Sequence, residues 1–200
     1  MTFLRHAPSS LRRPVRLALG GALLATAGLT LAACSSTSPS LYTLQPLPGP
    51  TPPGTGGLPS ATVPGGVEIR TPSISDTLDR DRIVLDDSQY RLQVSTTDAW
   101  STALSAQIPH VLAADLRQRM PGTSFFVQDD ATAGEAGAFV ELAISRFARD
   151  GSGNAVVDAE LVVYRAGNEA TRMARSLHLT VPAAAGTEGL VQGLSAALAR

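Results

Sequence analysis

The 200-residue chain has no lysine and only one cysteine, and just 16% of its residues are charged. A single cysteine excludes a disulfide framework within the chain and a zinc site built from several cysteines. All 16 basic residues are arginine, and the formal net charge is −1, so the chain lacks the excess of basic residues typical of nucleic-acid-binding proteins. Its hydrophobic content of 44% is sufficient for the core of one domain.

The charge is distributed unevenly along the chain. Residues 1–33 hold four of the 16 arginines and no acidic residue, so the rest holds 12 arginines against 17 acidic residues, a net charge of −5. In the first part, Arg12, Arg13 and Arg16 precede the uncharged run Leu17–Leu31. This run of 15 residues is shorter than the roughly 20 residues of a membrane-spanning helix, and it is typical of a secretory signal peptide.

The apolar run ends in Leu31-Ala32-Ala33-Cys34, so small residues directly precede the only cysteine. This tetrapeptide resembles the bacterial lipobox. The resemblance implies that signal peptidase recognises the first three residues and that Cys34 becomes a lipid-modified N-terminus. Ser35 follows where an Asp would retain a lipoprotein in the inner membrane, which implies the periplasmic face of the outer membrane. The alternative is an ordinary signal peptide followed by a buried cysteine.

Residues 35–67 carry no charge and are rich in proline and glycine, a composition that cannot fold alone. We therefore divide the chain into a cleaved signal peptide (1–33), a lipidated cysteine with a tether (34–65) and a folded domain (66–200). The tether contains a short predicted strand at 41–45, because Tyr and Thr favour extended backbone. If this strand docks on the domain, the free tether shortens to residues 35–40, about 20 Å at most.

The folded domain is predicted to contain strands and two helices. Asp86–Ser88 is expected to form the turn between two early strands, and Asp98 is expected to cap a helix that ends near Met120. Trp100 lies on the apolar stripe of that helix, which predicts a core position. A second helix is expected to begin near Thr187. Alternating apolar and polar residues predict strands at 67–69, 82–85, 90–94, 124–128, 139–149, 155–165 and 171–181.

These elements predict an α+β fold, in which a mostly antiparallel sheet carries two helices packed on one face. Tight turns between the last three strands indicate an antiparallel meander with one solvent-exposed face.

The sequence shows little sign of catalytic chemistry. His110 and His178 lack the spacing of a zinc site or a nucleophile motif, and are interpreted as structural or solvated residues. The acidic pairs Asp86-Asp87 and Asp129-Asp130 are interpreted as solvated turns, since adjacent carboxylates seldom face one another across a cleft. We therefore predict no enzyme, no metal site and no cofactor other than the covalent lipid on Cys34.

The loop at residues 77–82 concentrates charge before a strand, with Asp79, Arg80, Asp81 and Arg82 in sequence. One interpretation is a loop held by its own ion pairs. The other is a partner-contact surface formed by Asp79, Arg80 and Arg82, because the guanidinium group binds carboxylates and phosphates with two parallel hydrogen bonds.

Several of these motifs occur in a recognisable order. A lipobox cysteine is followed by Tyr42-Thr43-Leu44, Leu78-Asp79-Arg80 with Ile83-Val84, Trp100, and the run Val111 to Leu116. This order resembles the ABC-type transport auxiliary lipoprotein family, whose PqiC-like members accompany MCE-domain proteins.

The resemblance implies a non-enzymatic lipoprotein that docks a periplasmic MCE assembly at the outer membrane, supports membrane integrity and serves intermembrane lipid transport. Its implied partners are an MCE-domain protein, an ABC or PqiA-like permease and the membrane, with no nucleic acid. Whether the chain also forms a homo-oligomer is left open. The alternative function is a periplasmic module that itself holds an acyl chain in a cleft between sheet and helices. A periplasmic enzyme is a third, weaker alternative.

Overall fold

The computed structural model describes residues 38–48, 65–88, 90–131 and 133–200. Within this part of the chain, Pro39–Arg200 forms one compact unit. The predicted signal-peptidase residues Leu31, Ala32 and Ala33, the lipidation residue Cys34 and the sorting residue Ser35 lie outside the described residues and remain predictions.

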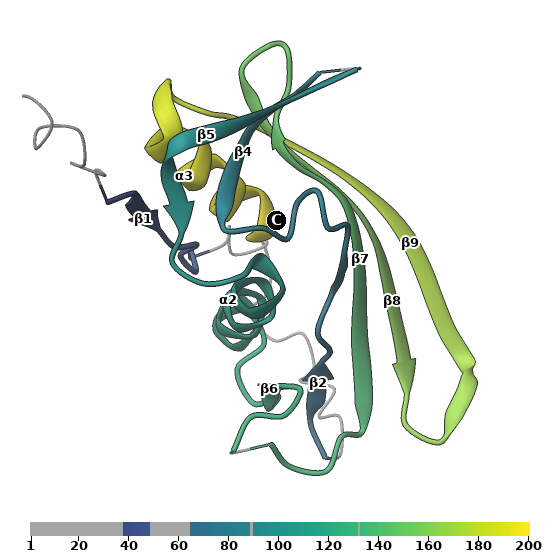
Figure 1. The fold of residues 1–200 in the computed structure, drawn as a ribbon. Coiled ribbons are helices and arrows are strands. Elements are labelled where there is room, and N and C mark those ends of the chain that lie inside the picture. Colours follow the sequence, from purple (N-terminus) through teal and green to yellow (C-terminus); the bar gives the residue numbers. More distant parts are fainter. Residues whose placement is uncertain (1–37, 49–64, 89, 132) are drawn as a thin grey trace, which may run out of the picture. The chain divides into compact units, whose positions relative to one another are not determined.

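The compact unit is built on a nine-stranded sheet (Figure 1). Its strands are β1 (Ser40–Tyr42), β2 (Val67–Ile69), β3 (Ser73–Ile74), β4 (Arg82–Ser88), β5 (Arg91–Trp100), β6 (Phe125–Val127), β7 (Ala138–Arg149), β8 (Asn154–Arg165) and β9 (Asn168–Pro182).

Strand β7 organises this sheet. One of its edges pairs with β8 along almost its whole length, and β8 pairs in turn with β9, which gives the predicted antiparallel meander. The other edge of β7 pairs with three short parallel segments in succession, namely β2, β3 and β4. Beyond these segments, β6 adds to β2, while β5 and then β1 add to β4. The sheet is therefore mixed, with its long strands antiparallel.

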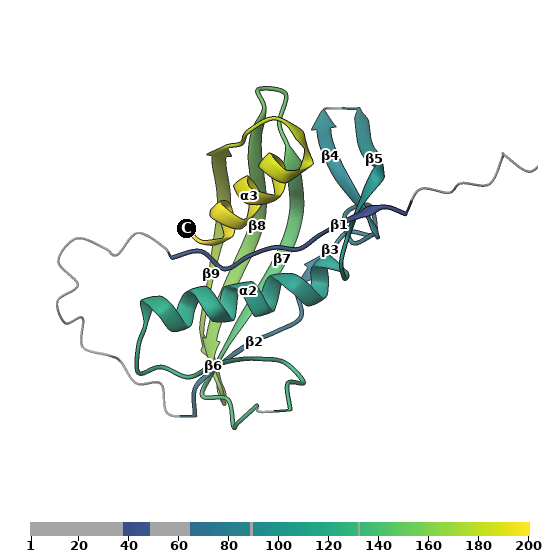
Figure 2. The same ribbon diagram turned by 90° about the vertical axis from the view of Figure 1, so that its left-hand side faces the viewer.

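Two helices, α2 (Leu104–Arg119) and α3 (Gly186–Leu198), pack on one face of the sheet (Figures 1 and 2). The core between helices and sheet is filled by large side chains from both layers, including Trp100, Ile108, Phe147, Leu190 and Leu194. Pro109 lies inside α2. The α+β architecture with two helices on one face is confirmed.

The structure corrects four local predictions. Asp98 does not cap a helix: it lies in β5, and α2 begins six residues later, after Ala103. Trp100 ends β5 rather than joining the helix, although it is buried in the core as expected. The reason is pairing with a distant segment, because β1 adds in parallel to Asp98–Trp100 and holds these residues extended.

The other two corrections concern a turn and a helix start. Asp86–Ser88 is the end of β4 and not a turn, because these residues pair with Leu92, Gln93 and Arg91 of β5. Thr187 does not cap α3, whose N-cap residue is Ala185. Its hydroxyl instead donates a hydrogen bond of 2.6 Å to Asp98 Oδ2.

Candidate functional site: the docked N-terminal strap

The described chain from Ser40 to Leu47, here called the N-terminal strap, docks on the folded unit. Its first residues form β1, which pairs in parallel with the end of β5. The remainder runs between the helices α2 and α3 (Figure 2). Leu44 is only 3% exposed and joins the main hydrophobic core, whereas Leu41 is 66% exposed. The question that the sequence left open is thereby answered: the strap docks.

Polar side chains of the helices hold the backbone of the strap. The Leu44 N–H donates to Gln107 Oε1 at 2.9 Å, and the Leu47 N–H donates to Asp115 Oδ1 at 2.8 Å, both on α2. The Gln45 N–H donates to Ser195 Oγ of α3 at 3.2 Å. All three acceptors are buried, so these contacts satisfy backbone donors that docking removes from water.

Asp115 is a buried carboxylate, with 2% of the residue exposed. Removal from water raises its pKa above the ordinary value of 3.8, although the Leu47 N–H and the nearby Arg119 favour the charged form. Its second oxygen, Oδ2, has no hydrogen-bond partner. The strap is thus fixed partly through an acidic group whose burial has a free-energy cost.

Sequence reasoning did not identify these acceptors. The available signal was their spacing, because Gln107 and Asp115 lie eight residues apart on one face of α2 with the buried Val111 between them. Polar residues at core positions of a helix need buried partners, and a docking backbone provides them.

The loop at residues 77–82 has structural contacts. Asp79 Oδ1 accepts a hydrogen bond of 3.2 Å from the Ser105 N–H, in the first turn of α2, which has no cap from its own N-cap side chain. The Arg82 guanidinium donates to the Thr96 carbonyl at 2.9 Å, and Arg80 is exposed. No ion pair joins the acids and arginines of this loop in the described structure, so the interpretation as an ion-paired loop is not supported there.

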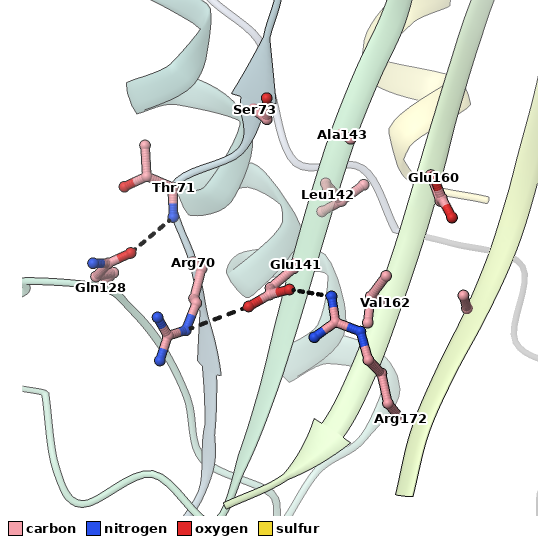
Figure 3. Close-up of a pocket in the computed structure, with 11 residues that line it drawn as sticks. Arg70, Thr71, Ser73, Gln128, Glu141, Leu142, Ala143, Glu160, Val162 and Arg172 are labelled. Atoms are coloured by element: carbon pink, nitrogen blue, oxygen red, sulfur yellow. Dashed lines mark hydrogen bonds and ion pairs between the residues drawn. The ribbon is translucent and has the colours of Figure 1, made fainter. Parts of the chain in front are cut away.

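A shallow groove of about 470 Å³ crosses the sheet (Figure 3). Glu141 on β7 lies between Arg70, at 4.0 Å, and Arg172 on β9, at 3.1 Å. Arg70 also stacks over Phe139. Burial, and after it the hydrogen bond that the Tyr164 hydroxyl donates to Glu141, raises the pKa of Tyr164. Polar and charged side chains, among them Arg70, Glu141, Glu160 and Arg172, interrupt the apolar part of its lining. The residues that line this groove come from separate strands and form no motif in the sequence, so the sequence did not predict the groove.

The histidines and acidic residues considered for catalysis in the sequence analysis either make local contacts within the fold or are exposed. His178 on β9 contacts the carboxylate of Asp158 on β8, and His110 is exposed on α2. Asp130 accepts a hydrogen bond from the Val127 N–H in the turn after β6. Across the described ranges, no group of three or more His, Cys, Asp or Glu side chains is placed to hold a metal ion. No helix in those ranges is long and apolar enough to cross a membrane.

The chain matches the sequence profile of the ABC-type transport auxiliary lipoprotein component over residues 42–200. This match spans most of the chain, and the chain therefore belongs to that family of auxiliary lipoproteins. The family resemblance expected from the ordered motifs is confirmed. The family is defined as an auxiliary lipoprotein component of a transport system, which is a membrane-associated, supporting role. The match begins at Tyr42, inside the strap, so it includes most of the docked segment.

Comparison with solved structures supports the fold. A crystal structure of an uncharacterised protein is similar with a TM-score of 0.62 at 17% identity, covering 81% of this chain and 92% of that one. A Xanthomonas campestris protein of the DUF330 family is similar with a TM-score of 0.62 at 15% identity, covering 80% and 88%. No curated protein matches the chain.

Proposed function

We propose that this chain is the outer-membrane lipoprotein of an MCE-type lipid transport system, anchored through Cys34 and docking the periplasmic MCE assembly at that membrane. The observation that carries this proposal is the docked strap. Because the compact unit begins at Pro39, only the residues from Ser35 to Ser38 separate it from the lipidated cysteine. Six residues from Cys34 to Ser40 span at most about 20 Å. Such an anchor keeps the domain against its membrane.

The partner surface is proposed to include the exposed Arg80. Asp79 and Arg82 are the other two contacts predicted from the sequence. Each also stabilises the fold, because Asp79 accepts a hydrogen bond from the start of α2 and Arg82 donates one to the β5 backbone. A partner contact is therefore tested most cleanly at Arg80, whose guanidinium can be removed without loss of a described contact.

The proposal is tested by affinity purification of the lipidated chain from its native host in mild detergent. We expect an MCE-domain protein and its permease to co-purify, and we expect Arg80→Ala to lower their yield by at least about threefold. Arg175→Ala, which removes another exposed arginine from β9, is the matched control and should leave the yield unchanged. Recovery of the lipoprotein without any MCE-domain protein would overturn the docking role.

The alternative function, direct binding of an acyl chain between sheet and helices, gains no support from the described core. That space is occupied by Ile108, Phe147, Leu190 and Leu194, each almost fully buried. A ligand-sized apolar cavity is the usual requirement for such binding. Lipid extracted with the purified protein and identified by mass spectrometry would revive this alternative.

A further inference from the structure

The side chains of the groove in Figure 3 lie in two neighbouring rows across the sheet. The pairing of β2 with β6 and β7 places Gln128, Arg70 and Glu141 next to one another in the first row. In the second row, Ala143 of β7 pairs with Glu160 of β8. These residues alternate along their strands with residues of the core, so the groove lies on the face of the sheet opposite the helices.

The Arg70 guanidinium is held in place without the use of its hydrogen-bond donors. It stacks over the Phe139 ring, with 4.4 Å from its central carbon to the ring centroid. Its Nε atom lies 3.7 Å from Glu68 and 4.0 Å from Glu141, and both distances are too long for a hydrogen bond. Among the described residues, no atom accepts a hydrogen bond from this guanidinium. Its N–H groups are therefore free to bind an anionic oxygen.

Gln128 adds further donors beside Arg70. Its Oε1 atom accepts the Thr71 N–H at 3.2 Å, so the amide is oriented with its NH2 group directed elsewhere. Figure 3 shows the Gln128 amide and the Arg70 guanidinium on the same side of the groove. Together they form a group of donors that suits a phosphate or carboxylate oxygen.

The other side of the groove carries a free negative charge. Glu160 on β8 is exposed and makes no hydrogen bond or ion pair with any described residue. Between the two sides, Glu141 and Arg172 pair with each other at 3.1 Å. Arg70 and Glu160 are two strands and two residues apart, which places their Cα atoms about 12 Å from each other. The groove thus has one free positive group and one free negative group, separated by an ion pair that is already formed.

We propose that this groove binds a zwitterionic phosphodiester, with its phosphate at Arg70 and Gln128 and its ammonium group at Glu160, as in the phosphoethanolamine head group of a phospholipid. A phosphodiester carries one negative charge and a primary ammonium group one positive charge, which matches the two free groups. The choice of a phosphodiester over a carboxylate rests on the proposed function in lipid transport. The shallow volume of about 470 Å³ suits a head group, whose acyl chains would lie outside the groove.

The test is isothermal titration calorimetry of the full mature chain in dodecyl maltoside without phosphate, with a matched pair of soluble ligands. Glycerophosphoethanolamine contains both the phosphodiester and the ammonium group. Glycerophosphoglycerol contains the same phosphodiester and no ammonium group. We expect glycerophosphoethanolamine to bind at least about threefold more tightly, because only its ammonium group pairs with Glu160.

Three variants assign the two ends of the ligand. Glu160→Gln should remove the preference for glycerophosphoethanolamine and leave the affinity for glycerophosphoglycerol unchanged. Arg70→Gln should weaken the binding of both ligands at least about tenfold, because both lose a charged hydrogen-bond donor. Glu188→Gln is the matched control, since it neutralises an exposed glutamate on α3, and it should change neither affinity. Circular dichroism verifies that each variant is folded.

Equal affinity of the unaltered chain for the two ligands would overturn the proposal, and so would a lack of binding at millimolar concentration. A preference that persists in Glu160→Gln would overturn the assignment of the ammonium group. Competition by micelles containing phosphatidylethanolamine, but not phosphatidylglycerol, would identify the ligand as a lipid head group. Binding of the soluble ligand without such competition would identify a free glycerophosphodiester at the same site. Failure of these titrations is distinct from failure of the proposed function, because the latter is measured by co-purification of the MCE-domain protein.

Discussion

Two carboxylates show how opposite surroundings tune the same group. Asp98 accepts hydrogen bonds from Thr187 and Ser95, and these, with Thr187 the largest cause, lower its pKa below 3.8. The pKa of Asp115 is raised above 3.8, chiefly because burial removes its carboxylate from water. The Asp98 contact joins β5 to the start of α3, whereas the Asp115 contact joins α2 to the strap. The two groups therefore impose opposite pH dependences on stability.

We predict the sign of each effect. Asp98 has a lowered pKa in the folded state, so its stabilisation is present above the unfolded value and is lost as the pH falls through the folded value. Asp115 has a raised pKa, so its carboxylate weakens the fold as the pH rises through the folded value. Relative to wild type, Asp98→Asn should lose stability with rising pH and Asp115→Asn should gain it, as measured by urea unfolding between about pH 3 and pH 7. Differences that run in the same direction would contradict the assignment.

Asp79 is predicted to act as a capping residue for α2 from outside the helix. Asp79→Ala should lower the free energy of unfolding by about 0.5–2 kcal/mol, because the Ser105 N–H loses its acceptor. Asp81→Ala, two residues later in an exposed position, is the control and should be near neutral. Thermal unfolding followed by circular dichroism measures both. Equal stability of the two variants would show that the contact does not contribute.

Among the elements, the strap matters most for the proposed function. Its sequence is part of a stretch rich in proline and glycine, and yet Ser40–Leu47 docks on the folded unit in one defined position. It is held by the pairing of β1 with β5, by the buried side chain of Leu44 and by three backbone hydrogen bonds to the helices. The strap is therefore expected to unfold with the domain and not to fray independently.

We predict that Leu44→Ala lowers the free energy of unfolding by about 2–5 kcal/mol, because it leaves a cavity in the core. Leu41→Ala is the matched control within the same strap, and its exposed side chain should make the change nearly neutral. Urea unfolding measures both variants, and hydrogen exchange at Gln45 reports whether the strap itself is released. A neutral Leu44→Ala would mean that the strap is only loosely held.

The elements also show what the sequence could predict. Alternation with tight turns was sufficient for the β7–β9 meander, since its pairings are local. It failed at Asp98 and Trp100, where the apolar spacing fits a helix but parallel pairing with β1, far away in sequence, imposes a strand. The acceptors Gln107, Asp115 and Ser195 were missed for the same reason: their role depends on a backbone segment that arrives from outside the helix.

At the scale of the whole molecule, the described unit is a domain with a filled core, and the proposed anchor Cys34 precedes it by a few residues in the sequence. The family establishes an auxiliary transport lipoprotein. The proposed function adds an outer-membrane anchor at Cys34 and a partner surface that includes Arg80. Docking at the outer membrane depends on that anchor, so lipidation of Cys34 is the central claim.

The most direct test is mass spectrometry of the N-terminal peptide of the mature chain, isolated from separated inner and outer membranes of its native host. The account predicts a peptide that begins at Cys34, carries covalently bound acyl chains, continues into Ser35 and is found in the outer-membrane fraction. An unmodified Cys34 in the soluble periplasmic fraction would contradict it.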